Sequence, residues 1–348
     1  MRIAIVNDVQ MIVEGLCRIV LSDPNNQIAW IAYNGAEAVD RCANDTPDII
    51  LMDLIMPEMN GVEATNIIMQ NTPCPILIVT SSVDKNSSMV FEAMGKGALD
   101  AISTPLFDSE HNSKIYEALL RKISLISVFS KADIRTTKNI KRKNEQDCRE
   151  ELHLIAIGSS SGGPNAIASI LKELPKDLDA AVVIVQHVDE KFSYAMAQWL
   201  NEQSTIPVRI AKSHDSPVRG EALLACTNDH LVMQEDGSLI YQEEPINMPY
   251  RPSVDVFWYS ICKYWHCYIS AVLLTGMGRD GAQGMLELKK HGYYTIAQDE
   301  STSAVFGMPK AAIDLGATSA VLPLDEIPKR LINRVLESTL DKLGKIDL

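Results

Sequence analysis

Three side chains that can act together in nucleophilic catalysis come after separate apolar runs in the second half of this 348-residue sequence. Ser160 lies in the motif GSSSGGP directly after the run LHLIAI, His187 comes after VIVQ, and Asp280 lies within LLTGMGRDGAQGM. A serine hydroxyl becomes a good nucleophile when an imidazole takes its proton, and a carboxylate orients that imidazole. The ends of three strands would bring these groups to one rim of a sheet, which indicates a hydrolytic triad.

The motif around Ser160 is typical of a sharp strand-to-helix turn that exposes a nucleophile and aims backbone N–H groups at an oxyanion. Flanking glycines give the turn room, and Pro164 suits the first position of a helix. The spacing does not separate Ser160 from Ser159 or Ser161 as the nucleophile. Taken alone, the motif also fits a phosphate-cradling loop or a flexible serine-glycine turn.

The segment that carries Asp280 also has the outline of a dinucleotide-binding fingerprint. Residues 276–281 read GMGRDG after an apolar run, and Asp299 lies further along the chain. However, Arg279 and Asp280 are bulky and charged where a pyrophosphate would have to approach closely. The segment also comes late in its half of the chain, whereas such a fingerprint usually opens a domain. Both observations disfavour dinucleotide binding.

In the first half, groups that can bind a cation or a phosphoryl group end three other apolar runs. Asp8 and Asp53 can supply oxygen ligands to a hard cation such as Mg²⁺, and Thr80 can donate a hydrogen bond to a phosphoryl oxygen. A carboxylate accepts a phosphoryl group only when a divalent cation offsets the accumulating charge. The alternative is that both aspartates only form turns.

The apolar runs predict two α/β domains, each a doubly wound parallel sheet, because strands alternate with amphipathic helices. We expect one domain over residues 1–127 and another over residues 152–348, with residues 128–151 as a charged linker. Expected strands cover residues 2–6, 28–33, 48–53, 75–81, 99–103, 152–158, 180–187, 268–276 and 293–299. Expected helices cover residues 9–21, 36–44, 61–70, 86–94, 164–174, 194–201, 282–291 and 309–315.

The composition restricts the function classes. A net charge of −13 repels nucleic acid, so we expect no nucleic-acid partner. We expect a cytoplasmic protein with no direct membrane insertion, since we find neither a signal peptide nor a long apolar run. The seven cysteines form no C-x-x-C pair, which argues against a disulfide framework or a structural zinc site.

The segment LMDLIMPEMNGVEA, residues 51–64, resembles the phosphoacceptor loop of bacterial response-regulator receivers, and the resemblance extends over residues 1–125. It implies that Asp53 is the phosphoacceptor, that Asp8 and Asp53 hold Mg²⁺, and that Thr80 is the switch hydroxyl.

The sequence departs from the receiver pattern in three places that bear on phosphorylation. Asn7 stands where a second acidic residue is usual, Ala101 replaces an aromatic residue and Thr104 replaces a lysine. Losing a carboxylate weakens a metal site, and losing the lysine removes an ion pair to the phosphate. The departures therefore bear on the rate, lifetime and readout of phosphorylation at Asp53.

The second half resembles the chemotaxis protein-glutamate methylesterases, the CheB family, over residues 152–335. The resemblance rests on IAIGSSSGGP, VIVQH, RPSVDVFW, LLTGMGRDGAQGM and AQDESTSAVFGMPKAA. It implies Ser160 as nucleophile, His187 as general base, Asp280 as orienting carboxylate and the Met277 N–H as an oxyanion donor. The implied activity is demethylation of glutamate methyl esters, and also deamidation of glutamines, with no cofactor for the esterase.

The same resemblance implies the partners: the cytoplasmic domains of methyl-accepting chemoreceptors, and a chemotaxis-type histidine kinase as phosphodonor. Phosphorylation of the receiver would regulate the esterase. Two alternatives are a non-catalytic docking protein on the same fold and a receiver that serves only as a dimerisation or docking module. A DNA-binding regulator is disfavoured by the second α/β domain and by the net charge.

Overall fold

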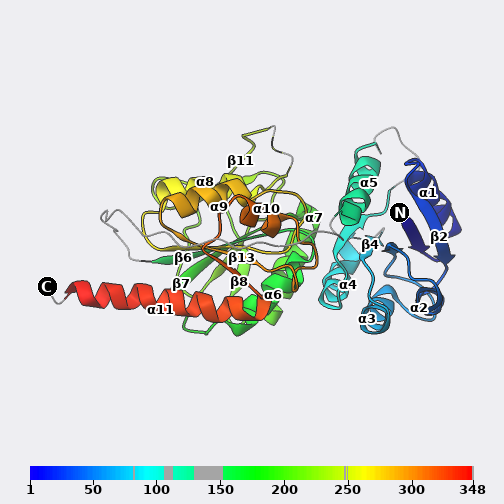
Figure 1. Ribbon diagram of the computed structural model, residues 1–348, viewed down its shortest axis with the longest axis horizontal. Helices are drawn as coiled ribbons and strands as arrows, with labels where there is room; N and C mark the ends of the chain where they lie inside the picture. Colours follow the sequence, from blue (N-terminus) through cyan, green and yellow to red (C-terminus); the bar gives the residue numbers. More distant parts are fainter. Residues whose placement is uncertain (81–82, 106–112, 129–151, 247, 249, 347–348) are drawn as a thin grey trace. The chain divides into compact units, whose positions relative to one another are not determined.

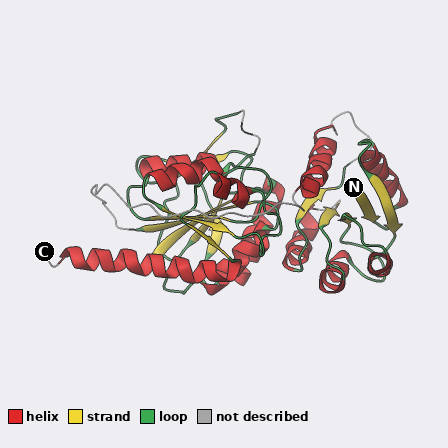
Figure 2. Ribbon diagram, viewed as in Figure 1, coloured by secondary structure: helices red, strands yellow, loops and turns green. Residues whose placement is uncertain are grey.

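The computed structural model describes residues 1–80, 83–105, 113–128, 152–246, 248 and 250–346. The chain divides into two compact units, Met1–Asp133 and Ile134–Leu348. The predicted linker, residues 128–151, lies outside the described residues except for its first position. Figure 2 shows that in each unit the strands form a central layer with helices on both sides.

The first unit is a five-stranded parallel sheet with the order β2-β1-β3-β4-β5. This order is one of the two common doubly wound arrangements, so the predicted fold class is confirmed for this unit. Its strands are β1 (Arg2–Val6), β2 (Gln27–Ala32), β3 (Ile49–Met52), β4 (Ile76–Thr80) and β5 (Asp100–Ser103). Its helices are α1 (Gln10–Leu21), α2 (Gly35–Asn44), α3 (Gly61–Asn71), α4 (Val83–Gly95) and α5 (Ser113–Val128).

The second unit contains a seven-stranded parallel sheet with the order β14-β13-β12-β6-β7-β9-β8. Its strands are β6 (His153–Ser159), β7 (Ala180–Gln186), β8 (Val208–Ile210), β9 (Ala222–Leu224), β12 (Ile269–Leu273), β13 (Tyr294–Gln298) and β14 (Ala320–Leu322). An antiparallel hairpin joins β10 (His230–Met233) to β11 (Leu239–Gln242). The helices are α6 (Gly163–Glu173), α7 (Glu190–Gln203), α8 (Val254–Tyr264), α9 (Ala282–Lys290), α10 (Met308–Asp314) and α11 (Ile327–Ile346), with a 3₁₀ turn at Leu324–Glu326.

The order in which strands are added to the second sheet reverses at β6 and β12, which are parallel neighbours. From β6 the chain continues to β7 on one side, whereas β12 is succeeded by β13 on the other. Loops leave the carboxyl ends of such a strand pair in opposite directions and leave a crevice between them, where doubly wound proteins place their ligands. The loops that carry Ser160 and Asp280 come after β6 and β12, so both lie at the carboxyl ends of this strand pair.

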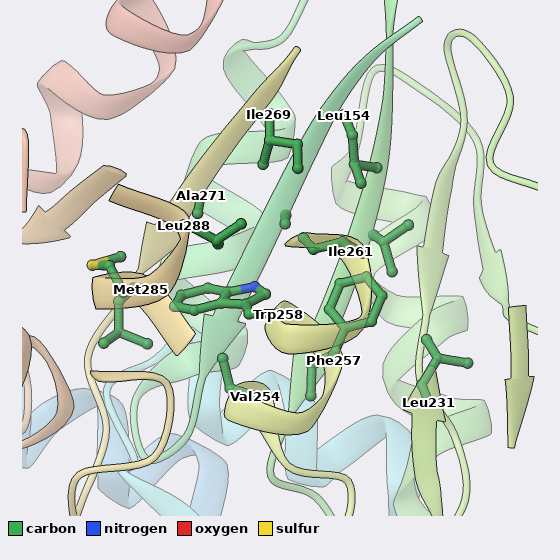
Figure 3. Close-up of a cluster of buried hydrophobic side chains, with 14 of the residues drawn as sticks. Leu154, Leu231, Val254, Phe257, Trp258, Ile261, Ile269, Ala271, Met285 and Leu288 are labelled. Atoms are coloured by element: carbon green, nitrogen blue, oxygen red, sulfur yellow. The ribbon is translucent and has the colours of Figure 1, made fainter. Parts of the chain in front are cut away.

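Helices α8, α9 and α10 cover one face of the second sheet, and α6 and α11 cover the other (Figure 1). Figure 3 shows Trp258 and Phe257 of α8 packed among Leu154 and Ile269 from the sheet. Both aromatic side chains are completely buried. Burying each contributes about 2–3 kcal/mol, so this cluster fixes the start of α8 against the sheet. Among the described residues, no helix is both long and apolar enough to cross a bilayer.

Candidate active site

Ser160 lies in a tight turn between β6 and α6 and is only 7% exposed. Its N–H donates to Thr275 O at 3.1 Å, and its carbonyl accepts from Gly163 N at 2.8 Å. Gly162 has a φ of 76°, in the left-handed region that glycine adopts without strain. The backbone around Ser160 is therefore bonded on both sides, and the predicted strand-to-helix turn is present.

Gln186, the last residue of β7, ties this turn to the strand that ends before His187. Its Oε1 accepts from Ser159 Oγ at 2.5 Å, and its Nε2 donates to Ser160 O at 2.8 Å. The His187 N–H in turn donates to Ser159 O at 3.1 Å. Because the Ser159 hydroxyl is committed to Gln186, the geometry favours Ser160 over Ser159 as the nucleophile.

His187 and Asp280, predicted as base and orienting carboxylate, are hydrogen-bonded: His187 Nε2 lies 2.7 Å from Asp280 Oδ2. Asp280 also accepts from the start of α8, from Ser253 Oγ at 2.8 Å and Val254 N at 2.7 Å. Burial raises the pKa of Asp280, but the bonds from His187, Ser253 and Val254 outweigh it, and the pKa lies below its ordinary value. Asp280 is therefore ionised at neutral pH and can only accept hydrogen bonds.

The ionised Asp280 determines which ring nitrogen of His187 carries the proton. A carboxylate accepts, so Nε2 is protonated and Nδ1 carries the lone pair of the neutral imidazole. Nδ1 is buried and has no hydrogen-bond partner in the part of the chain that the structure describes. No hydrogen bond between Ser160 Oγ and the His187 ring is formed among those residues. The structure thus joins the imidazole and the carboxylate and leaves the base nitrogen of His187 unpaired.

Tyr250 covers one face of the His187 ring. The two ring centroids are 4.4 Å apart with an interplanar angle of 4°, which is a stacked arrangement. The Tyr250 hydroxyl also lies against the loop that precedes Asp280, because a Cβ built on Gly278 would come within 2.7 Å of it. The imidazole is therefore held by an in-plane bond from one side and by an aromatic ring over its face.

The loop after β12 places a free donor beside Ser160. Gly276 packs directly on the serine, since an added Cβ would lie 2.8 Å from Ser160 Cβ. The next residue, Met277, donates its N–H to no acceptor within the described ranges. An unpaired backbone N–H next to a nucleophile is what an oxyanion needs. The Ser160 N–H is already bonded to Thr275 O, which leaves Met277 as the better candidate donor.

Asp8, Asp53 and Thr80, which were predicted to bind a cation or a phosphoryl group, lie at the carboxyl ends of neighbouring strands in the first sheet. Asp53 is 8% exposed and accepts from Leu54 N at 2.7 Å and Asn7 Nδ2 at 2.9 Å. Burial, and then the charge of Asp8, raise the pKa of Asp53 to about 6. A carboxylate whose charged form is disfavoured by burial and by a neighbouring carboxylate fits a divalent cation, which would supply the missing positive charge.

Thr80 and Thr104 lie side by side at the ends of β4 and β5, because Thr104 N donates to Thr80 O at 2.9 Å. Both are buried, and Thr104 Oγ1 has no partner among the residues described. Across the described ranges of both units, no cluster of three or more His, Cys, Asp or Glu side chains is arranged to hold a metal ion.

Several residues that build the site are not predicted from the sequence. Gln186 and Tyr250 lie in or beside the motifs VIVQH and RPSVDVFW, but an amide or a phenol carries no signal of its own role. Thr275 and Gln298 support the loops: Thr275 N donates to Gln298 Oε1 at 2.9 Å, and Thr275 Oγ1 donates to Ser161 O at 2.9 Å. In the sequence, only their positions at or just after the ends of strands indicate this supporting role.

Comparison with known proteins gives the same division of the chain. Residues 155–331 match the family model CheB methylesterase, and residues 3–116 match the model Response regulator receiver domain. The chain is 48% identical over 332 residues to protein-glutamate methylesterase/protein-glutamine glutaminase 3 of Pseudomonas aeruginosa, covering 95% of this chain and 98% of that relative. It is 50% identical over 335 residues to protein-glutamate methylesterase/protein-glutamine glutaminase 1 of Pseudomonas fluorescens, covering 95% and 98%.

Among solved structures, the catalytic domain of the Thermotoga maritima CheB methylesterase is 35% identical with a TM-score of 0.49, covering 52% of this chain and 97% of that chain. The response regulator domain of Thermotoga maritima CheB is 32% identical with a TM-score of 0.33, covering 36% and 93%. With about half of its residues shared with full-length relatives and both domain models matched in order, the chain belongs to the CheB methylesterase family, as a member with a response regulator receiver domain.

Proposed function

We propose that this chain is a serine hydrolase that removes methyl esters from glutamates of methyl-accepting chemoreceptors and deamidates their glutamines. The observation that carries the proposal is the 2.7 Å bond between His187 Nε2 and Asp280 Oδ2, at the crevice where Ser160 turns out of β6. The names of the two Pseudomonas relatives, protein-glutamate methylesterase/protein-glutamine glutaminase, give the substrate class.

In the proposed reaction, Ser160 Oγ attacks the ester carbonyl carbon and its proton moves to His187 Nδ1. The new carbon–oxygen bond forms as the carbonyl electron pair moves to oxygen, where the Met277 N–H stabilises the negative charge. Asp280 keeps Nε2 protonated and stabilises the imidazolium. The imidazolium then gives its proton to the leaving methoxide, and methanol departs.

The acyl-enzyme is released by the same groups working on water. His187 Nδ1 takes a proton from the water as it attacks the acyl carbon, and returns it to Ser160 Oγ. The product is a free glutamate carboxylate. A glutamine amide presents the same carbonyl geometry, and its nitrogen takes the proton from the imidazolium and leaves as ammonia. No cofactor takes part in any of these steps.

The first step requires Ser160 Oγ to reach Nδ1. Catalytic hydrogen bonds are often loose without substrate and tighten in the Michaelis complex. The backbone bonds that hold Ser160 to Thr275 and Gln186 leave its side chain free to rotate about Cα–Cβ. We propose that a rotation of this kind brings the hydroxyl to the unpaired nitrogen when substrate binds.

The test is methanol release from methylated receptor by the full chain and by Ser160→Ala. We expect the variant to lose at least about 10³-fold in kcat with an unchanged melting temperature, because the nucleophile is removed and the fold is not. Ser161→Ala is the matched control and should retain activity. If wild type releases no methanol, the esterase proposal is wrong and a non-catalytic docking role takes its place. If Ser160→Ala remains active, Ser160 is not the nucleophile.

For the receiver we propose that Asp53 accepts a phosphoryl group from a chemotaxis-type histidine kinase, with Asp8 and Asp53 holding Mg²⁺. The cation would offset negative charge at the acceptor. Thr80 would then bond the phosphoryl oxygens and report their presence to the esterase. We expect a small-molecule phosphodonor plus Mg²⁺ to label wild type and not Asp53→Asn, and to change methanol release only in the labelled protein.

We further assign residues 1–127 to the receiver, residues 128–151 to a linker and residues 152–348 to the esterase. The proposed partners, the cytoplasmic domains of chemoreceptors and the kinase, place the protein in the cytoplasm. A net charge of −13 does not favour nucleic acid as a further partner.

A further inference from the structure

At the start of each of the helices α8 and α9, a carboxylate accepts hydrogen bonds from backbone N–H groups of the other helix. Asp280, just before α9, accepts from the first N–H groups of α8, Val254 N at 2.7 Å and Asp255 N at 3.1 Å. Asp255, in the first turn of α8, accepts from Gly284 N of α9 at 2.6 Å. Each carboxylate thus satisfies donors that the other helix leaves unpaired, and the two caps share one buried junction.

Placing the Asp255 carboxylate at this junction lowers the free energy of unfolding, because its charged form is disfavoured there. The residue is only 8% exposed. Burial, and then the charge of Asp280, raise the pKa of Asp255 to about 7, although N–H groups of Gly284, Gly281 and Gln283 pull it down. A neutral side chain at this position would not place a second carboxyl beside Asp280. A group kept where its own charged form is disfavoured is a candidate for a functional role.

The position of Asp255 indicates what that role is. The segment of residues 276–281 carries both the Met277 N–H and Asp280, and its two ends are fixed differently. Gly276 packs on Ser160 at one end, and Asp255 binds the start of α9 at the other end. An additional Cβ on Gly284 would lie 3.2 Å from Asp255 Cα, so the two helices are in close contact at this point.

We propose that Asp255 is a positioning residue of the esterase site, which holds the start of α9 so that Asp280 and the Met277 N–H keep their orientation toward His187 and the substrate carbonyl. This inference rests on the proposed esterase function. It assigns a role to the aspartate of RPSVDVFW that packing of its apolar neighbours does not explain.

The test is Asp255→Asn in the full chain, assayed by methanol release and by thermal unfolding at pH 8. Asparagine keeps one oxygen acceptor for Gly284 N, but it loses the charge and one of the two carboxylate oxygens that share the N–H groups of Gly284, Gly281 and Gln283. We expect kcat to fall about ten- to hundredfold because Asp280 and Met277 are less firmly held, while KM stays within about twofold because no substrate contact is lost. The melting temperature should be equal to or higher than that of wild type, since a disfavoured carboxylate has been removed.

Glu287→Gln is the matched control, because it removes one charge from α9 at a half-exposed position that pairs with Lys290. It should change neither kcat nor KM. A wild-type kcat in Asp255→Asn overturns the proposal, and so does a variant that is unfolded or melts well below wild type, since Asp255 would then serve only the fold. Absence of methanol release by wild type is a separate result, which contradicts the esterase function itself.

Discussion

At the scale of single residues, Gln186 has no reactive group and yet bonds both sides of the nucleophile turn. Replacing it with alanine removes the acceptor of Ser159 Oγ and the donor to Ser160 O. A buried polar group left unpaired costs about 1–3 kcal/mol, so we expect Gln186→Ala to unfold at lower urea concentration. We also expect kcat to fall by about tenfold or more, because the serine is less well oriented.

Ser159→Ala is the control for this prediction, since it deletes one of the two bonds and leaves Gln186 Nε2 on Ser160 O. It should retain most of the activity. Equal kcat values for Gln186→Ala and wild type would show that the turn holds its shape without the amide.

The stack of Tyr250 on His187 leads to a second prediction at this scale. An aromatic pair of this kind is worth about 0.5–1.5 kcal/mol beyond its buried area, so we expect Tyr250→Ala to lower kcat about three- to tenfold. Tyr250→Phe keeps the ring and should stay close to wild type. Steady-state methanol release distinguishes the two variants, and an equal loss in both would assign the effect to the hydroxyl instead of the stack.

At the scale of elements, the turn between β6 and α6 depends on a backbone conformation. Gly162 has a φ of 76°, and an added Cβ would lie 2.6 Å from Ala304 Cβ. Strain of this kind costs about 1–3 kcal/mol, so Gly162→Ala should lower both the melting temperature and kcat. Gly237→Ala is the matched control: its φ is 82°, but nothing lies within 4 Å of the new Cβ, so its loss of stability should be smaller and kcat unchanged.

The elements themselves are largely predictable, because apolar runs of parallel strands and amphipathic helices leave clear periodic patterns. The strands that end just before Ser160, His187 and Asp53 agree with prediction to within one or two residues. Strands β8, β9 and β14 are only three residues long and are absent from the prediction, since so few residues carry no periodicity. Helix α8 is visible in the sequence only as the motif RPSVDVFW. The hydrogen bonds from its first N–H groups to Asp280 are therefore not predicted.

The sequence predicts the reactive groups of the candidate site but not the residues that orient them. Ser160 and His187 come directly after strands, and Asp280 lies in the loop after β12. Parallel strands bring the residues at their carboxyl ends to one edge of the sheet. The bonds that orient them come from Gln186 and from the start of α8, through contacts between distant parts of the sequence. Side-chain directions of that kind depend on the packed sheet, which a local pattern does not specify.

At the scale of the whole molecule, the receiver contributes a charge that opposes its own folding. The pKa of Asp53 is raised to about 6, above its ordinary value of 3.8, so the native state binds the proton more tightly than the unfolded state. Stability from this group is present at low pH and is lost as pH rises through about 4 to 6, by about 3 kcal/mol at most. We therefore expect Asp53→Asn to be more stable than wild type at pH 8 and equal to it at pH 4.

Urea unfolding at the two pH values measures this difference. Asp40→Asn, which neutralises an exposed carboxylate on α2, is the control, and its difference in stability from wild type should be the same at both pH values. Mg²⁺ at pH 8 should stabilise wild type and not Asp53→Asn, because ligand binding to the native state adds to its stability. A wild type that gains nothing from Mg²⁺ would contradict the cation site at Asp8 and Asp53.

The pairing of β6 with β12, at which the order of strands in the sheet reverses, has a consequence for the biosynthesis of the enzyme. The histidine and the aspartate that bond each other are 93 residues apart, and the strand before the aspartate lies in the middle of its sheet. Pairings between such distant segments form slowly, because a long stretch of chain must be ordered before they are made. A ribosome-bound chain that has emerged only as far as the nucleophile has neither its carboxylate nor its neighbouring strand. The nascent polypeptide therefore gains hydrolytic competence only after Asp280 and the strand before it have left the ribosome.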